Sequence, residues 1–264
     1  MAMRYVLCPF LQSRDGGIKR NLNQLQHKIY FKHDDRRGTL QFIKLNQETQ
    51  NPLYKPGESL FSNAETNLSH VKAGDIIYLI AHGDHTNETF GSSREKVKPR
   101  LFIFPDRDYE SMTIEQLVAL LIRNGLSDGS STDPIYIRLI VCNAGGPKMS
   151  DELIRQIVGD RYNPKDDLDF NHYNTSSPLF DDYITKHQDH IMARQVAIEF
   201  YRKGLLNVRV GGYPGELDIL DGKAYIYATW NGISQQVAIK HAMLWFDGQG
   251  RVIRNKGGRP PTHR

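Results

Sequence analysis

Two short apolar runs constrain the fold of this chain more than any other feature. The first covers residues 76–81 and leads directly into His82 and Gly83, and the second covers residues 137–141 and leads into Cys142. Both have the length of a strand and are rich in β-branched residues, as in strands that are buried on both faces of a parallel sheet. The two runs therefore predict an α/β fold with a mostly parallel central sheet.

Each run stops at a residue that can take part in nucleophilic catalysis. In an open α/β sheet, ligands bind at the carboxyl ends of the strands. His82 and Cys142 are therefore predicted to follow parallel neighbouring strands and to face each other across one crevice, within a few ångströms or within an easy loop movement of that distance. Such a pair catalyses acyl transfer, because the imidazole takes the thiol proton, or holds the thiolate as an ion pair, and the sulfur attacks a carbonyl.

The segments around these runs predict three helices, of which one covers residues 150–158. A capping-box pattern of Thr113 and Gln116 begins the first helix, and Gly125 ends it. A longer helix is predicted over residues 183–203. The polar segment before it, residues 160–182, has no helical or strand periodicity and is interpreted as a solvated loop.

The C-terminal third predicts β structure attached to the same domain. A strand over residues 207–211 is followed by two hairpins, over residues 217–230 and 243–253. We expect one domain over residues 1–250, with β-hairpin additions at the C-terminus, and a basic, disordered tail over residues 251–264.

Composition limits the compartment and the partners. The two cysteines, Cys8 and Cys142, make no disulfide framework. No apolar run approaches the ~20 residues of a membrane span, which predicts no membrane partner. The short apolar piece near the N-terminus lacks the cleavage site of a secretory signal. A cytoplasmic protein is expected, or one delivered into a reducing host cytosol by a non-classical secretion route. The formal charge of +4 lies largely in the tail, which disfavours nucleic acid as a partner.

The order of these features resembles the caspase–hemoglobinase superfamily of cysteine peptidases (clan CD). The segment over residues 139–146 is similar to the Cys-x-x-Gly block of that superfamily. The helix start over residues 112–117 is similar to the bacterial branches, which are the autoprocessing domains of large toxins and the CHAT-type peptidases. The resemblance covers residues 75–146 and extends weakly to Gly211. It implies a caspase-like three-layer sandwich around the parallel sheet.

The resemblance also implies a role for each residue of the two blocks. Cys142 becomes the nucleophile and His82 the acid and base. The backbone N–H groups of Gly83 and of Cys142 itself become the oxyanion donors. The implied activity is that of a cysteine endopeptidase that needs no cofactor and cleaves a protein or peptide substrate, or the chain itself.

In the superfamily, the strand after the cysteine helices forms one wall of the primary specificity pocket. The corresponding residues here run from 208 to 216, and the substrate-binding candidates in and after them are Arg209, Gly211, Glu216 and Asp218. Glu216 or Asp218 would favour a basic side chain of the substrate, whereas Arg209 would favour an acidic one. The sequence leaves both alternatives open.

Two other functions compete with a peptidase. The first is a catalytically inactive interaction module of the same fold, although an intact histidine and cysteine argue against it. The second is a metal-dependent hydrolase, in which His82, Asp84 and His85 would bind Zn²⁺ and activate water. Their spacing matches neither a helical His-x-x-x-His pair nor the alternating His/Asp loop of metallo-β-lactamases, and the metal reading is therefore the weaker one.

Overall fold

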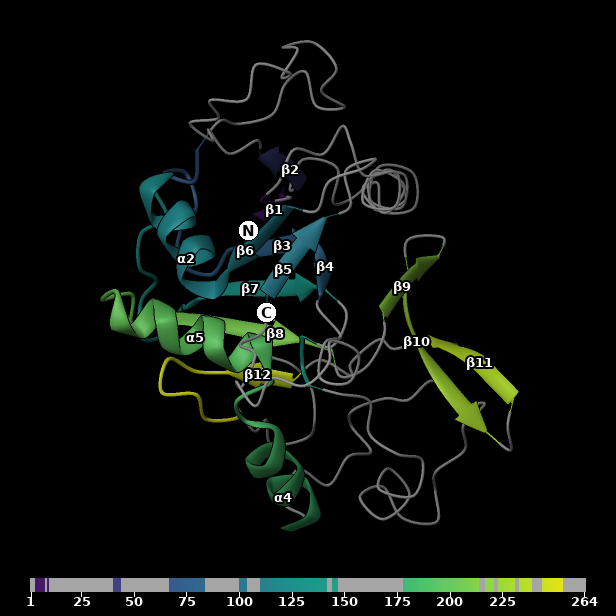
Figure 1. The fold of residues 1–264 in the computed structure, drawn as a ribbon. Helices are drawn as coiled ribbons and strands as arrows, with labels where there is room; N and C mark the ends of the chain where they lie inside the picture. The colour runs from purple at the N-terminus through teal and green to yellow at the C-terminus, as the bar shows by residue number, and fades with distance from the viewer. Residues whose placement is uncertain are drawn as a thin grey trace.

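The computed structural model describes part of the chain, shown in colour in Figure 1. The described residues are 3–7, 9, 40–43, 67–83, 100–103, 110–141, 144–146, 178–213, 217–220, 223–230, 233–238 and 244–253.

The centre of the molecule is a six-stranded sheet. Five neighbouring strands are parallel, and the sixth, at one edge, is antiparallel to its neighbour. The predicted α/β class with a mostly parallel sheet is confirmed. In spatial order the strands are β2 (Leu40–Ile43), β1 (Arg4–Leu7), β3 (Ile76–Ile80), β7 (Ile135–Ile140), β8 (Val208–Gly212) and β12 (Leu244–Phe246).

The two apolar runs form the strands β3 and β7 at the middle of this sheet, as predicted. On one face Ile77, Leu79, Ile137 and Leu139 are completely buried, and on the other face Ile76, Ile80 and Ile140 are also buried. Burial on both faces explains why these strands are almost uniformly apolar instead of alternating between apolar and polar residues.

The helix α2 (Ile114–Arg123) begins and ends as the sequence predicts. The Thr113 side chain accepts a hydrogen bond from the Gln116 N–H, and the Gln116 side chain accepts one from the Thr113 N–H. Gly125 follows the helix with a φ of +94°, in the left-handed region that favours glycine. The apolar stripe of α2 is buried, and the helix packs beside α5 (Met192–Arg202), which in turn lies against β8 and β12 (Figure 1).

The single helix predicted over residues 183–203 is wrong, because two helices occupy this region. The helix α4 (Pro178–His187) ends four residues before α5 begins. Between them the Gln188 carbonyl accepts a hydrogen bond from the Gln195 side chain, and the buried Ile191 lies at the start of α5. The last five residues of the predicted loop, 178–182, are also helical, with Pro178 at the first helical position, where proline needs no N–H partner.

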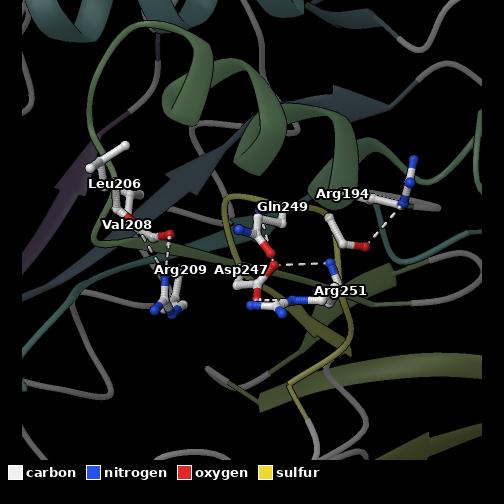
Figure 2. A network of polar contacts seen from close by, with 8 residues as sticks. Arg194, Leu206, Val208, Arg209, Asp247, Gln249 and Arg251 are labelled. Atoms are coloured by element: carbon white, nitrogen blue, oxygen red, sulfur yellow. Dashed lines mark hydrogen bonds and ion pairs between the residues drawn. The ribbon is translucent and has the colours of Figure 1, made fainter. Parts of the chain in front are cut away.

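Both C-terminal hairpins are present. The strands β9 (Leu217–Leu220) and β10 (Lys223–Trp230) pair antiparallel, and β11 (Ile233–Ala238), which the sequence analysis missed, adds a third strand. The second hairpin turns at Asp247, whose carboxylate accepts from the N–H groups of Gln249 and Arg251 and pairs with the Arg251 guanidinium (Figure 2).

The structure places the first residues of the expected tail in this second hairpin. Val252 forms a bridge with Phe246 of β12, and Ile253 donates its N–H to the Trp245 carbonyl. Residues 254–264, and the helix predicted over residues 150–158, lie outside the described residues. In the described part of the chain, no helix is both long enough and apolar enough to cross a membrane.

Hydrogen bonds to the Asp128 carboxylate link the segments that lead into β7 and β8. The Asp128 carboxylate accepts hydrogen bonds from the Leu206 and Asn207 N–H groups at 3.0 and 2.7 Å, and from the Asn207 side chain at 3.0 Å. The Asn207 carbonyl then accepts from the Ile135 N–H at the start of β7. These bonds fix the register of β7 and β8 at the amino-terminal ends of the two strands.

Candidate functional site

The strands β3 and β7 are parallel neighbours, as predicted, and pair from Ile76 opposite Tyr136 to Ile80 opposite Ile140. His82 comes two residues after this last pair on one strand, and Cys142 comes two residues after it on the other. The intervening Ala81 and Val141 are both buried. The carboxyl ends of the two runs therefore meet at one edge of the sheet.

The histidine block continues into a second, small sheet. His82 and Gly83 form β4 (His82–Gly83), in which they pair with Phe102 and Leu101 of β5 (Arg100–Ile103). The strand β5 also pairs antiparallel with β6 (Glu110–Thr113), which leads into α2. Cys142 itself lies outside the described residues, so the distance between imidazole and sulfur, and the two oxyanion donors, stay predictions.

The chain turns sharply after Val141, within the cysteine block. The Val141 carbonyl accepts a hydrogen bond from the Ala144 N–H at 3.3 Å. The next residues, 144–146, here called the 144–146 turn, are held from two directions. The Gly145 N–H donates to the Tyr213 carbonyl at 2.8 Å, and the Ala144 carbonyl accepts from the Ala193 N–H at 2.8 Å. The ends of β8 and the start of α5 thus fix the backbone that follows position 142.

Two glycines allow this turn to pack closely. Gly146 has a φ of +110°, and a Cβ there would lie 2.6 Å from the Tyr183 hydroxyl. Gly212, at the end of β8, has no such backbone requirement, but its Cβ would lie 2.5 Å from the Ala144 carbonyl carbon. Only a glycine lets β8 approach the 144–146 turn so closely.

The four substrate-binding candidates lie in different places. Gly211 is in β8, opposite Arg138 of β7. Arg209 lies near the amino-terminal end of β8, and its guanidinium donates to the Leu206 and Val208 carbonyls (Figure 2). Asp218 belongs to β9, and Glu216 is outside the described residues. The structure does not bring Arg209 to the carboxyl edge, where the histidine and cysteine blocks end.

Sequence reasoning missed a cluster of aromatic residues around Arg138. The Arg138 guanidinium carbon lies 5.4 Å from the centre of the Tyr78 ring and 5.7 Å from the centre of the Trp245 ring. Its terminal nitrogen donates to the Tyr78 hydroxyl at 3.4 Å. Burial raises the pKa of the nearby Tyr213 phenol, and the Arg138 cation opposes that shift. We call Arg138, Tyr78 and Trp245 the Arg138 cluster; its only sequence signal is one charged residue inside an apolar strand.

The metal reading gains no support from the residues that the structure describes. Among these residues, no group of three or more His, Cys, Asp or Glu side chains could hold a metal ion. Asp84 and His85 of the alternative site lie outside them.

We compared the chain with protein-family models, with curated proteins and with solved structures, and nothing matched it in any of the three comparisons.

We expect acid to destabilise the region near the 144–146 turn through protonation of His187, which lies on α4. Its ring lies 4.9 Å from the ring of Tyr183, the residue that contacts position 146. Burial, reinforced by the charges of Lys186 and His190, lowers the pKa of His187 from its ordinary value of about 6.5. The folded state therefore takes up the proton less readily than the unfolded chain.

The neutral His187 ring should therefore contribute fully to the free energy of unfolding above pH ~6.5. This contribution should be lost as the pH falls through the lower pKa of His187 in the folded state. His187→Gln should remove this part of the acid destabilisation. Urea unfolding of the natural and the variant chain at pH 7.5 and at pH 5 measures this effect. The free energy of unfolding should fall less between the two pH values in the variant than in the natural chain. An equal acid loss in both chains would contradict the assignment.

Proposed function

We propose that the chain is a cysteine endopeptidase in which Cys142 is the nucleophile and His82 the acid and base. The observation that supports this most is the pairing of β3 with β7 up to Ile80 and Ile140. Neighbouring strands in a sheet lie about 4.8 Å apart, so two chains that leave such a pair start within side-chain reach of each other. The histidine and the cysteine each follow this pair after a single intervening residue.

The reaction needs only groups that these two blocks supply. The imidazole of His82 takes the proton of the Cys142 thiol, and the thiolate attacks the carbonyl carbon of the scissile peptide bond. The backbone N–H groups of Gly83 and Cys142 bind the resulting oxyanion, a contribution of about 3 kcal/mol for one donor. The protonated imidazole then gives its proton to the leaving amine. Water hydrolyses the remaining thioester and regenerates the thiol.

The proposal extends to a caspase-like arrangement of layers around the sheet. The parallel strands have the order β2-β1-β3-β7-β8, and the chain order reverses between β1 and β3. In doubly wound sheets, ligands bind at the carboxyl edge near such a reversal. His82 follows β3, which borders the reversal, and a substrate bound there would lie beside the dyad.

Two features support a reducing compartment. A thiol nucleophile works only while it is reduced, and the sequence offers no disulfide framework. The compartment that fits is the cytoplasm, or a host cytosol into which the chain is delivered.

Active-site labelling tests the proposal directly. A panel of tagged acyloxymethyl ketones that carry different primary residues should label the full chain at Cys142, as located by peptide mass spectrometry. Labelling should be unchanged in EDTA, because no metal takes part. Loss of hydrolytic activity in EDTA and its recovery with Zn²⁺, without labelling of Cys142, would favour the metal-dependent hydrolase instead. Absence of both labelling and hydrolysis would favour the inactive interaction module.

A further inference from the structure

Tyr183 anchors the helix α4 to the rest of the molecule. Among the α4 side chains that the structure describes, Tyr183 is the buried one, with 4% of its surface exposed, while Ile184 and His187 are half-buried. In Figure 1, α4 projects away from the central sheet, whereas α5 lies against it, and α4 packs far less extensively on the other described elements. A helix of ten residues that buries so little surface depends strongly on each tertiary contact that it makes.

Tyr183 meets the core at Gly146. A Cβ at position 146 would lie 2.6 Å from the Tyr183 hydroxyl, 3.4 Å from the ring carbon that bears this hydroxyl, and 3.2 Å from Cγ1 of Ile191. The end of the Tyr183 ring therefore rests directly on the Gly146 backbone. The His187 ring, also from α4, packs on the Tyr183 ring with a distance of 4.9 Å between the ring centres.

The 144–146 turn is thus held by three different elements. The Ala144 carbonyl accepts a hydrogen bond from the Ala193 N–H of α5, and the Gly145 N–H donates to the Tyr213 carbonyl that follows β8. Both of these bonds join backbone groups, whereas α4 acts on the turn through the side chain of Tyr183. A substitution of Tyr183 therefore tests the contribution of α4 and leaves the residues of the turn unchanged.

The start of α5 depends on the same turn. The N-cap residue of α5 is Ile191, and an isoleucine has no side-chain oxygen that could accept from the first N–H groups of the helix. The Ala144 carbonyl accepts from one of these groups instead, the Ala193 N–H, at 2.8 Å. A displaced turn would lose this bond together with the contact to Tyr183. The three contacts therefore favour one position of the turn, in which all of them are made at once.

We propose that Tyr183 is a positioning residue for the nucleophile: through Gly146 it holds the backbone that follows Cys142 in the place from which the sulfur attacks. This inference rests on the proposed peptidase function. Gly146 lies four residues after Cys142, whose N–H is one of the two proposed oxyanion donors, so a displaced turn would move the nucleophile and this donor together. Reacting groups and oxyanion donors act well only within about 0.5 Å of their productive positions.

Amide hydrogen exchange measures the hold of Tyr183 on the turn without any catalysis. In Tyr183→Ala, the Gly145 and Ala193 N–H groups should exchange at least ~10-fold faster relative to the amides of β3, because the turn has lost one of its three contacts. The matched control is Tyr5→Ala. Tyr5 is 3% exposed and donates its hydroxyl to the His70 carbonyl at 3.2 Å, but it lies in β1, which β3 separates from β7. Equal acceleration of the two amides in both variants would overturn the hold of Tyr183 on the turn.

The kinetics of Cys142 labelling by an acyloxymethyl ketone measure the effect on the reaction, on full chains well below their melting temperatures. In Tyr183→Ala the maximal rate of labelling should fall at least ~10-fold, since a shift of ~1 Å at the reacting groups costs roughly 10²-fold, while the affinity for the probe stays unchanged. Tyr183→Phe, which keeps the ring, should lose less, and Tyr5→Ala should label at the natural rate. A lower melting temperature of Tyr183→Ala with an unchanged maximal rate would overturn the positioning role.

A double variant tests whether Tyr183 acts through Gly146. In Gly146→Ala the new methyl group meets the Tyr183 hydroxyl, and the φ of +110° adds strain, so the maximal rate of labelling should fall. Tyr183→Phe in this background removes the hydroxyl oxygen and should raise the rate again, although the same change lowers the rate in the natural chain. A double variant that labels no faster than Gly146→Ala alone would overturn the route through Gly146.

The two kinds of measurement separate this inference from the proposed function. Labelling of Tyr183→Ala at Cys142 with the natural maximal rate would refute the positioning role and leave the peptidase proposal intact. Faster amide exchange in Tyr183→Ala, together with a natural chain that no probe labels, would refute the peptidase and keep the hold of α4 on the turn.

Discussion

Alanine at position 142 is expected to abolish probe labelling and peptide cleavage while the chain stays folded. Loss of the thiol removes the only atom that forms the covalent intermediate, so the rate should fall on the order of 10⁴-fold or more. His82→Ala should cause a loss of similar order, because residues that act as one unit are not additive, and the double variant should be little worse than either single one. Initial cleavage rates and labelling of purified chains measure these effects.

The matched control is Cys8→Ala, which removes the other thiol of the chain. It should retain labelling and cleavage at rates close to those of the natural sequence. Circular dichroism and melting temperature establish that each variant is folded. Labelling that moves to Cys8, or cleavage that survives in Cys142→Ala, would contradict the assigned nucleophile.

Valine in place of Gly212 is expected to damage both stability and reactivity. A side chain at this position meets the backbone of Ala144, whose carbonyl carbon and oxygen would lie 2.5 and 2.7 Å from the new Cβ. Backbone atoms cannot swing aside as a side chain can, so β8 and the 144–146 turn must separate. Overpacking of this kind costs about 1–3 kcal/mol of the free energy of unfolding. A shift of ~1 Å in the residues after Cys142 should slow labelling by roughly 10²-fold.

Gly248→Ala provides the comparison for this variant. Its Cβ would lie 2.8 Å from the ring of Tyr201, which is 41% exposed, and 2.9 Å from the Tyr201 Cβ, which is fixed to the backbone of α5. This variant should therefore also lose stability, but it should keep its labelling rate because the atoms that the new Cβ meets belong to Tyr201 and not to the 144–146 turn. Urea unfolding and labelling kinetics on both chains separate the two effects. A Gly212→Val chain that is less stable but labels at the normal rate would show that the 144–146 turn does not position the nucleophile.

The sequence predicted the elements whose causes are local. The apolar runs of β3 and β7 reflect burial on both faces, and the capping box of α2 lies within four residues, so both patterns are visible in the chain itself. The break between α4 and α5 was missed because one of the contacts that hold the start of α5 is not local. The Ala193 N–H at the start of α5 donates to the Ala144 carbonyl, 49 residues earlier in the sequence.

The Arg138 cluster was invisible for the same reason. Tyr78 precedes Arg138 by 60 residues, and Trp245 reaches it only because β12 joins the sheet antiparallel beside β8. Hydropathy patterns indicate that a strand is buried, but they do not indicate which strands become neighbours. The order of the strands brought one charged residue of an apolar strand into contact with two aromatic rings.

The short edge strand β12 has a consequence for how copies of this protein meet. Edge strands expose unpaired backbone groups that can recruit a strand from another molecule. Here the outer side of β12 is already occupied by its own chain, because Val252 bridges Phe246 and the Ile253 N–H donates to the Trp245 carbonyl. A second molecule could extend the sheet at this edge only after the hairpin had opened. The turn at Asp247 thus protects the protein against edge-to-edge aggregation on this side.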